Sequence, residues 1–444
     1  MRILILSNYP WKTNNSFGNT YSSIFGRVPN IEIAHIYMFD GNPDAVNNIT
    51  AYYQIPEREV IKSALCLRNK GEAGKRVEVP TSEDKEEPQQ KKSENKALYG
   101  RLLALGKRTH WDLMFVAREL AWKLGRVNYP DLMAFVEEFK PDIFFLPYSY
   151  TYYTNRIALY IKKHYNVPMV MEMAMDHYTL NRVSWNPIFW LDRFGKRKQI
   201  RKLAKQAEMM FVISKKLKQE LEKELGIECK VLYKTPDINR AFKTYTPNDG
   251  KKPVSFLFTG NIYANRWKSL AMLAQELKDL EYGHLDIYTA TPISTAMKKA
   301  LEIEGVSTIH PPVGQDEVIG LQNNADVLVH TEAFDKYNKS LVRCAISTKI
   351  MDYLSVGRCI LAIGPRDISS IEYLSDNDLA LIARSQQELH TIISNLKEYP
   401  DSIAEYAQKG RSYVTQFLNE EKIRTEFYEY LQSIIDKYNN NSIV

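Results

Sequence analysis

The chain has 444 residues, of which 44% are hydrophobic and 25% charged, the composition of a folded protein long enough for two domains. No apolar stretch approaches the roughly 20 residues of a membrane-spanning helix, and the first apolar run is too short for a signal peptide. The four cysteines have neither CxxC nor zinc-ligand spacing, which excludes a disulfide framework and indicates a reducing compartment, so we expect a cytoplasmic protein.

The charge is unevenly distributed along the chain. The net charge is +6, but residues 1–250 contain 39 basic and 28 acidic side chains, whereas the remainder contains 20 and 25. A basic half joined to an acidic half suggests that the first half faces an anionic surface or an anionic substrate.

An α/β pattern begins at the N-terminus. Strands are predicted at 2–7 and 31–38, with a helix at 21–27 between them. The loop after the first strand should lie at the carboxyl end of the sheet, where doubly wound domains bind ligands. Gly18 and Asn19 in this loop would allow close approach of a ligand and are acceptor-binding candidates, although a glycine at such a turn is as often structural.

The next part of the chain contains a charged segment and a tyrosine cluster. Residues 69–97 are nearly free of apolar side chains, which predicts a flexible surface insertion. A helical pattern covers 99–139, with a break near Pro130, and a strand follows at 143–146. Segment 148–153 then holds four tyrosines, which either stack against a sugar or pack in the core with their hydroxyls at the surface.

Asp176 and His177 directly follow a predicted strand at 168–173. The carboxyl end of a parallel strand is where chemistry or acceptor binding is usually placed. Both residues are therefore candidates for catalysis and acceptor binding, and a purely structural pair is the alternative.

Ten basic residues and one acid lie between positions 193 and 218, and aromatic side chains precede them. A basic amphipathic helix with aromatic residues at its start is typical of an interfacial membrane helix, attracted to anionic lipid by about 1 kcal/mol per charge. Nucleic acid would attract the same charge, but no nucleic-acid-binding module is recognisable, and a solvated helix face is a third possibility. We expect an anionic membrane surface and no nucleic acid as partner. The predicted membrane-contact residues are Trp190, Lys196, Arg197, Lys198, Arg201 and Lys202.

A second α/β series follows a polar, turn-rich segment at 234–252, which marks the expected boundary between domains 1–240 and 250–420. Its first strand leads through a glycine turn into a helix that carries Arg266 and Lys268 near its start. This is an anion-binding arrangement, and the Arg fork and Lys point charge together suit a diphosphate.

Ser347 and Thr348 begin a further predicted helix, directly ahead of Lys349. The free N–H groups and the positive end of the helix dipole make such a start an anion site, to which Lys349 adds a charge. Asp352 lies on the same side of the helix, where it can accept hydrogen bonds from sugar hydroxyls. Phosphate at the cap and a diol one turn deeper indicate a nucleotide, and a capped helix with a surface lysine is the simpler alternative.

Three stretches together resemble the donor domain of GT-B glycosyltransferases, specifically glycosyltransferase family 4. They are residues 258–268, 325–335 and 347–358. The resemblance is specific over 254–375 and looser over the N-terminal half. It implies the GT-B fold, with two doubly wound Rossmann-like α/β domains that face each other across a cleft and a terminal helix at 421–444 that crosses back to the first domain.

The resemblance also implies roles for individual residues. Arg266 and Lys268 would grip the donor diphosphate. Glu332 would contact the transferred sugar, and Asp352 would hold the ribose. These two acids lie 20 residues apart, further than in the family motif, and the second is Asp in place of Glu. The implied donor-binding set is Gly260, Asn261, Arg266, Lys268, Val313, Glu332, Ser347, Thr348, Lys349 and Asp352. The catalytic candidates are Asp176, His177, Arg266, Lys268 and Glu332, and the acceptor-binding candidates are Gly18, Asn19, Asp176 and His177.

The implied reaction is retaining transfer of a sugar from a nucleotide-sugar to a glycan or lipid-linked acceptor in surface polysaccharide synthesis, with no metal or other cofactor. An Asp-x-Asp sequence at 376–378 is typical of metal-bound diphosphate in the other glycosyltransferase fold, but its position late in the second domain favours an acidic turn. A GT-B-fold sugar-nucleotide epimerase or hydrolase and a non-catalytic nucleotide-binding module remain open as alternatives.

Overall fold

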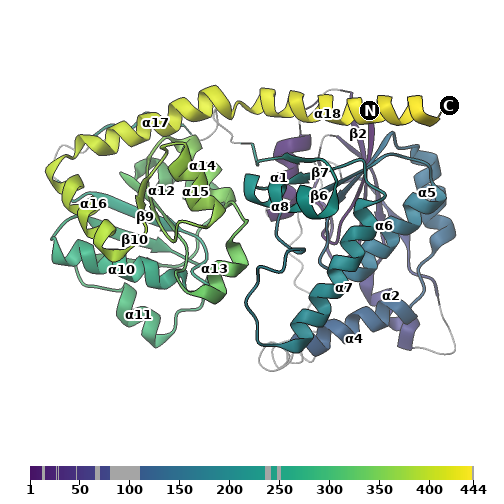
Figure 1. Cartoon of the computed structure of the whole chain (residues 1–444), viewed down its shortest axis with the longest axis horizontal. Helices are drawn as coiled ribbons and strands as arrows, with labels where there is room; N and C mark the ends of the chain where they lie inside the picture. Colours follow the sequence, from purple (N-terminus) through teal and green to yellow (C-terminus); the bar gives the residue numbers. More distant parts are fainter. Residues whose placement is uncertain are drawn as a thin grey trace.

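The computed structural model contains two α/β lobes, each built on its own sheet, that lie side by side (Figure 1). The predicted fold class of two doubly wound domains is thereby confirmed. The residues that the structure describes are 1–12, 16–26, 28, 30–46, 48–65, 71–80, 111–235, 242–247 and 252–442.

The first lobe is built on an eight-stranded sheet. Its strands are β1 (Arg2–Leu6), β2 (Glu32–Tyr37), β3 (Ile49–Gln54), β4 (Lys75–Val77), β5 (Ile143–Pro147), β6 (Met169–Met173), β7 (Met209–Val212) and β8 (Cys229–Val231). They lie in the order β4-β3-β2-β1-β5-β6-β7-β8, and all neighbours are parallel except β3 and β4. Alternate side chains of a strand face opposite sides of the sheet, so Leu4 and Leu6 enter one core while Ile3 and Ile5 enter another.

The helices of the first lobe connect these strands. They are α1 (Ser16–Phe25), α2 (Glu57–Leu65), α4 (Trp111–Leu124), α5 (Tyr129–Phe139), α6 (Tyr152–His164), α7 (Pro187–Ala204) and α8 (Lys215–Leu225). Helix α1 starts about one turn earlier than the sequence predicted. The break predicted near Pro130 in the helical pattern over 99–139 is confirmed, because the described part forms the two helices α4 and α5. Helix α5 has Asn128 as its side-chain N-cap and Pro130 within its first turn. The predicted insertion at 69–97 lies mostly outside the described residues, which include β4 from it.

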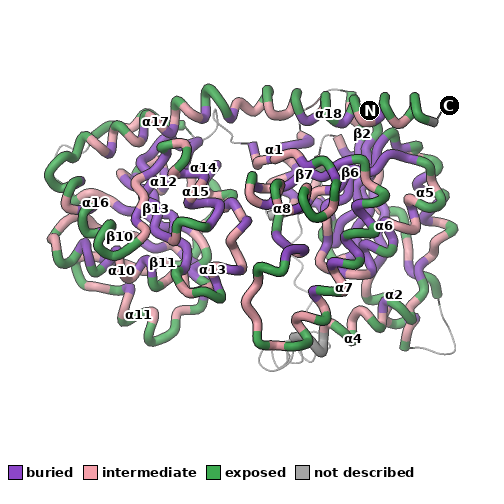
Figure 2. The backbone as a smooth tube through the Cα atoms, viewed as in Figure 1, coloured by how far each residue is buried: buried purple, intermediate pink, exposed green. Residues whose placement is uncertain are grey.

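The second lobe has a six-stranded sheet whose neighbouring strands are all parallel. Its strands are β9 (Ser255–Thr259), β10 (His284–Tyr288), β11 (Ser307–His310), β12 (Val327–Thr331), β13 (Cys359–Ile363) and β14 (Leu381–Ala383), in the order β11-β10-β9-β12-β13-β14. Its helices are α10 (Arg266–Asp279), α11 (Thr295–Leu301), α12 (Gln315–Asn324), α13 (Lys336–Val342), α14 (Thr348–Val356), α15 (Ser369–Asp376), α16 (Gln386–Glu398) and α17 (Asp401–Phe417). Figure 2 shows the buried strands at the centre of each lobe.

The last helix, α18 (Glu420–Ser442), continues from α17 and runs along the first lobe (Figure 1). Phe427 of α18 is buried among aromatic rings of that lobe, with its ring centre 5.1 Å from that of Phe211 and 5.4 Å from that of Phe25. The C-terminal end of the chain therefore completes the core of the N-terminal lobe. None of the helices in the described residues is long and apolar enough to cross a membrane.

Polar contacts join the two lobes where α8 of the first lobe faces the segment between α13 and α14. Arg343 makes two hydrogen bonds of 2.6 Å to the carboxylate of Glu220. The Ser214 hydroxyl donates to the carbonyl of Cys344 at 2.7 Å. These contacts hold the start of α14 close to the first lobe.

We expect that replacing Phe427 with Ala lowers the free energy of unfolding of the first lobe by about 3–5 kcal/mol, because the cavity left among the aromatic rings cannot be refilled. Chemical denaturation followed by tryptophan fluorescence measures this loss. Glu429→Ala on the exposed face of the same helix is the control. Equal stability of Phe427→Ala and the control would show that α18 is not part of this core.

Candidate functional site

Each sheet has one point where the strand order reverses direction, and polar side chains gather at both. In the first lobe the reversal lies between β1 and β5, and in the second between β9 and β12. The crevice beyond the carboxyl ends of the strands at such a point is the usual ligand site of open α/β sheets. These two positions are therefore the candidate ligand sites.

The second lobe carries an ion pair at its reversal point. Glu332 follows β12 and Arg266 begins α10, and the guanidinium donates two hydrogen bonds, of 3.0 and 3.1 Å, to the two carboxylate oxygens. The Glu332 side chain is only 4% exposed, and that of Arg266 25%. Burial raises the pKa of Glu332, an effect that Arg266 and Lys349 oppose.

Lys349 of α14 also lies near Glu332, at the carboxyl end of the second sheet. Its ammonium donates to the carbonyl of Thr259 at 2.9 Å and passes over Gly260, where an added Cβ would collide with it. Gly260 also has a φ of +124°, a backbone conformation that favours glycine. Burial, reinforced by Arg266, lowers the pKa of Lys349 to about 8. The lysine is thus a buried cation at neutral pH.

His330 belongs to this group and was not among the residues predicted from sequence. It lies on β12, with Nε2 3.2 Å from the Ser370 hydroxyl and 3.7 Å from a carboxylate oxygen of Glu332. Burial, with Lys349 and Arg266 nearby, lowers its pKa to about 3, so the ring is neutral. The feature of the sequence that could have identified His330 is its position near the end of an otherwise mostly apolar strand. We refer to Arg266, His330, Glu332 and Lys349 as the cation cluster.

Lys268 does not join the cation cluster, contrary to the predicted pairing of Arg266 with Lys268. Its side chain is exposed, and its ammonium lies 5.7 Å from the ring centre of Trp267. The physical reason is helical geometry, because residues i and i+2 of a helix do not share a face. Lys349 supplies the second cation in its place.

The start of α14 lies beside the cation cluster and faces the first lobe. Ser347 occupies the N-cap position, and its hydroxyl does not bond to the helix start within the described part of the chain. Thr348 is exposed there. Asp352, one turn further, is paired with Lys234 of the first lobe, whose ammonium lies 2.6 Å from its carboxylate. Lys234 was missed because it stands alone in a segment taken as a linker.

The remaining donor candidates lie on loops at the same edge of the second sheet. Asn261, directly after Gly260, is exposed, and Val313, just before α12, is partly buried. No described contact assigns a task to either residue, so both stay predictions.

A cavity of about 470 Å³ opens at the reversal point of the first sheet and extends to Thr348 of the second lobe. The side chains that line it are mainly aromatic and apolar, with a few polar groups among them. They include Tyr9, Phe17, Tyr21, Ile24, Tyr148, Tyr150, Glu172, Met175, His177, Ile213, Leu232, Lys234 and Thr348. An apolar cavity with a small number of convergent polar groups is the usual form of a small-molecule site.

His177 and Asp176 have different environments. His177 lines the cavity with its ring centre 5.4 Å from that of Tyr148, and burial together with Lys196 and Arg193 lowers its pKa to about 3. Asp176 is buried and accepts hydrogen bonds from the hydroxyl and N–H of Thr179 and from Arg193 at 2.9 Å. Burial alone would raise the pKa of Asp176, but these donors hold it below its usual value. Asp176 therefore positions the loop that carries His177.

Gly18 and Asn19 do not line the cavity, and the α1 residues that do are Phe17, Thr20, Tyr21 and Ile24. Gly18 lies inside α1, and a Cβ there would collide with the backbone of Lys12, so its small size serves packing. The helix begins about one turn earlier than predicted, which places both residues inside α1, and acceptor binding by Gly18 and Asn19 stays a prediction.

The four tyrosines at 148–153 were predicted either to contact a sugar or to pack in the core, and two of them lie in each kind of position. Tyr148 and Tyr150 line the cavity. Tyr152 donates to Asp192, and Tyr153 stacks on Trp122 with ring centres 3.9 Å apart. Two tyrosines are thus available to a ligand and two belong to the packing.

Some of the basic side chains predicted to contact a membrane form ion pairs within the protein instead. Arg197 is buried and pairs with Glu224 at 2.8 Å, and Lys196 pairs with Asp192 at 2.6 Å. Trp190 is partly buried and donates to the carbonyl of Ser184. The exposed face of α7 carries apolar and basic side chains at steps of three and four residues. Its members are Leu191, Phe194, Lys198, Arg201, Lys202 and Lys205.

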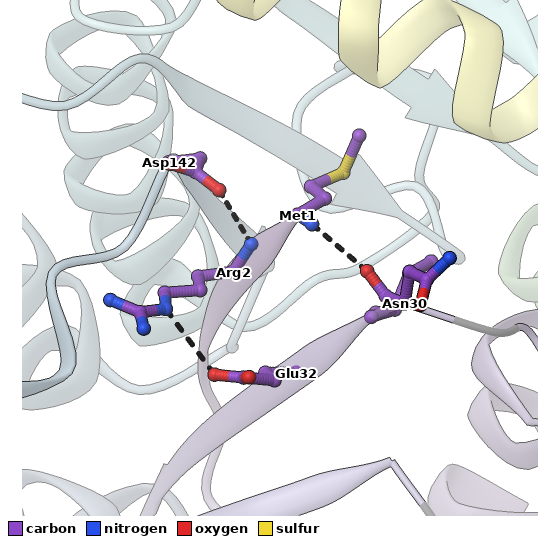
Figure 3. Close-up of a pocket in the computed structure, with 6 residues that line it drawn as sticks. Met1, Arg2, Asn30, Glu32 and Asp142 are labelled. Atoms are coloured by element: carbon purple, nitrogen blue, oxygen red, sulfur yellow. Dashed lines mark hydrogen bonds and ion pairs between the residues drawn. The ribbon is translucent and has the colours of Figure 1, made fainter.

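Two other features lie away from the candidate site. The acidic turn at 376–378 ends α15, and Asp378 pairs with Lys409 at 2.7 Å. Among the described residues no group of three or more His, Cys, Asp or Glu side chains is arranged to hold a metal ion. A pocket at the amino ends of β1 and β2 is lined by residues that pair with one another, such as Arg2 with Glu32 (Figure 3).

Solved structures with the same fold include several enzymes of sugar transfer. HepE of Anabaena, solved with UDP, has a TM-score of 0.62 and 12% identity over 98% of this chain and 100% of that chain. Sucrose-phosphate synthase from Thermosynechococcus elongatus has a TM-score of 0.61 and 10% identity over 98% and 99%. A glycosyltransferase from Rickettsia africae has a TM-score of 0.57 and 11% identity over 98% of each chain. No protein-family model and no curated protein sequence matches the chain. At these identities the likeness shows that the chain shares the fold of these proteins.

We expect Lys349→Met to raise the melting temperature at pH 7. Lowering the lysine pKa from 10.5 to about 8 corresponds to a cost of about 3 kcal/mol for the buried charge. Between pH 8 and 10.5 the unfolded chain binds the additional proton, so the stability of the wild type rises with pH and the advantage of the variant shrinks. Thermal denaturation at pH 7 and pH 9.5 measures both effects.

Lys336→Met, a change of an exposed lysine at the start of α13, is the control for Lys349→Met. It should leave the difference between the two pH values as in the wild type. A melting temperature of Lys349→Met at or below that of the wild type at pH 7 would contradict a buried, destabilising charge.

Proposed function

We propose that this protein is a nucleotide-sugar glycosyltransferase of the family 4 type. It transfers a hexosyl group with retention of configuration to a hydroxyl of a glycan or lipid-linked acceptor in surface polysaccharide synthesis. The observation that carries the proposal is the cation cluster, which lies at the reversal point of the second sheet beside the start of α14. The shared fold with HepE, which was solved with UDP-glucose, supports a nucleotide-sugar as the donor.

The cation cluster suits a leaving diphosphate. Arg266 and Lys349 both act on Glu332 beside the start of α14, and these cations together with the positive end of the helix dipole would stabilise developing negative charge. The bond between the anomeric carbon and the diphosphate oxygen breaks, and its electron pair stays with the diphosphate. The acceptor oxygen then bonds to the anomeric carbon, and its proton passes to a diphosphate oxygen.

Two acids at the site form internal ion pairs. Glu332 is held by Arg266, and Asp352 by Lys234. We propose that the transferred sugar binds against Glu332 and the ribose against Asp352. The cations that these acids release then face the diphosphate, so donor binding exchanges internal ion pairs for pairs with the substrate.

The cavity of the first lobe supports an acceptor site next to the donor site. It is lined by His177 and by the rings of Tyr148 and Tyr150, and it reaches Thr348 at the start of α14. An acceptor hydroxyl in this cavity lies on the first-lobe side of the donor. His177, neutral because of its lowered pKa, is available to hydrogen-bond an acceptor hydroxyl.

The exposed face of α7 supports association with an anionic membrane. Leu191 is 73% exposed and Phe194 54%. They share this face with Lys198, Arg201 and Lys202, which are also exposed. Apolar side chains that enter the interface and basic side chains that meet lipid phosphates are the two components of a peripheral membrane helix. This contact would bring a lipid-linked acceptor to the cavity.

A thermal-shift titration with UDP, GDP and their sugars tests the donor site. A ligand at 100 times its dissociation constant stabilises the folded protein by about 2.7 kcal/mol, which one nucleotide should achieve with the wild type. Arg266→Ala should lose about 1.5–3 kcal/mol of binding free energy, because a hydrogen-bonded charge is removed. Lys278→Ala, at the exposed end of α10, is the matched control. No shift with any nucleotide, or a shift equal in Arg266→Ala and the control, would overturn the donor site.

Sedimentation with vesicles that contain anionic lipid tests the membrane contact. Replacing Lys198, Arg201 and Lys202 together with Glu should reduce binding by about a hundredfold or more, at about 1 kcal/mol per charge near the surface. A variant with Lys278, Lys298 and Lys299 of the second lobe replaced with Glu has the same net charge and is the control. Equal binding by both triple variants would show that α7 is not the contact surface.

A further inference from the structure

Glu172 is an acidic residue within the buried sheet of the first lobe. It occupies β6, whose other four residues are buried and apolar. Its neighbours in the sheet register are Pro147 of β5 and Phe211 of β7, which carry no charge. A carboxylate in such a strand is costly unless a partner compensates for its lost hydration. The sequence shows it as a single charge in the run Met169–Met173, and no role had been assigned to it.

Among the described residues, one side-chain hydrogen bond reaches the carboxylate of Glu172. The hydroxyl of Tyr21 on α1 donates to one carboxylate oxygen at 2.6 Å. Burial raises the pKa of Glu172 to about 7, against the lowering effect of this bond. The hydrogen bond from Tyr21 therefore compensates only in part for the lost hydration of the Glu172 carboxylate. Carboxylates with such a raised pKa are often found at ligand-binding sites.

Glu172 and Tyr21 both line the cavity that extends to Thr348. Around them the cavity presents the rings of Tyr9, Tyr148 and Tyr150. A carboxylate that accepts hydrogen bonds and aromatic rings that offer flat apolar faces are complementary to a sugar ring, which has hydroxyls at its edge and C–H groups on its faces. The cavity thus combines the two features that a bound pyranose needs.

We propose that Glu172 is an acceptor-binding residue, whose carboxylate accepts hydrogen bonds from the hydroxyls of a pyranose ring held between the cavity tyrosines. This inference rests on the proposed function and names the acceptor chemistry of that site. The ring belongs to the acceptor, because the cavity is built almost entirely by the first lobe, whereas the cation cluster lies in the second. Tyr21 positions the carboxylate through its hydroxyl.

The pH dependence follows from the other titratable groups of the cavity. These are His177, Lys234, Tyr9, Tyr21, Tyr148 and Tyr150. Burial lowers the pKa of His177 to about 3 and raises the pKa of Tyr9, Tyr21 and Tyr148, so these groups keep their protonation state near neutral pH. Ionisation of Glu172 should therefore strengthen sugar binding between pH 6 and pH 8.

The test measures binding of methyl glucoside, methyl galactoside and methyl mannoside by saturation-transfer NMR, with the full chain saturated by the nucleotide that gives the largest thermal shift. We expect the wild type to bind at least one of these glycosides more tightly at pH 8 than at pH 6. Glu172→Gln should weaken binding about tenfold or more and remove the pH dependence, while nucleotide binding stays unchanged. Glu119→Gln, which changes another partly buried carboxylate of the same lobe outside the cavity lining, is the matched control.

The possible outcomes separate this inference from the proposed function. Equal binding and equal pH dependence in Glu172→Gln and the control would overturn the role of Glu172. If the protein binds a nucleotide but none of the three glycosides gives a saturation-transfer signal, the sugar cavity is overturned and the donor site stands. Failure to bind any nucleotide would overturn both. If Glu172→Gln does not fold, Tyr21→Phe keeps the ring and removes the hydroxyl that holds Glu172. It should weaken glycoside binding several-fold, and unchanged binding would overturn the proposal.

Discussion

The pairing of Glu332 with Arg266 is the interaction on which the candidate site depends. A carboxylate that is only 4% exposed requires a cation, and the two hydrogen bonds of Arg266 fix the start of α10 against the end of β12. Lys349 adds a second buried cation from α14, and Gly260 leaves the space that this side chain needs. Three loops are thereby brought together at the reversal point of one sheet. Such a concentration of buried charge is costly for folding, which is consistent with its use for binding.

The two lobes divide the chemistry between them. The second lobe concentrates cations beside a helix start, which suits a diphosphate, whereas the first lobe offers a cavity of aromatic rings with Glu172 and His177. Lys234 and Asp352 connect the two across the interface at 2.6 Å. The Asp352 side chain is 42% exposed and Lys234 contacts one of its oxygens, so a ligand that hydrogen-bonds the other oxygen would lie beside a cation of the first lobe.

The sequence predicted the fold class because most of the strands are apolar runs bounded by polar or glycine residues, whereas the charged strand β4 drew no prediction. Lys349 and Asp352 could be placed on one side of a helix from their spacing alone. The partners were less predictable. Lys268 was predicted to act together with Arg266, but its position two residues further along the helix directs it to another face. Arg197 was predicted to lie at the surface, but it is buried and pairs with Glu224. No role was predicted for Glu172 or Lys234, because each is an isolated charge in the sequence. Their position in the cavity depends on contacts that form only when the chain folds.

The central claim is that the cation cluster binds the diphosphate of a nucleotide. Calorimetric titration with UDP, GDP and the corresponding nucleosides between pH 7.5 and pH 9.5 tests it most directly. We expect that one diphosphate binds far more tightly than its nucleoside, and that its affinity falls as pH rises through about 8, where Lys349 loses its charge. Equal affinity for nucleotide and nucleoside, or an affinity that does not change over this range, would contradict it.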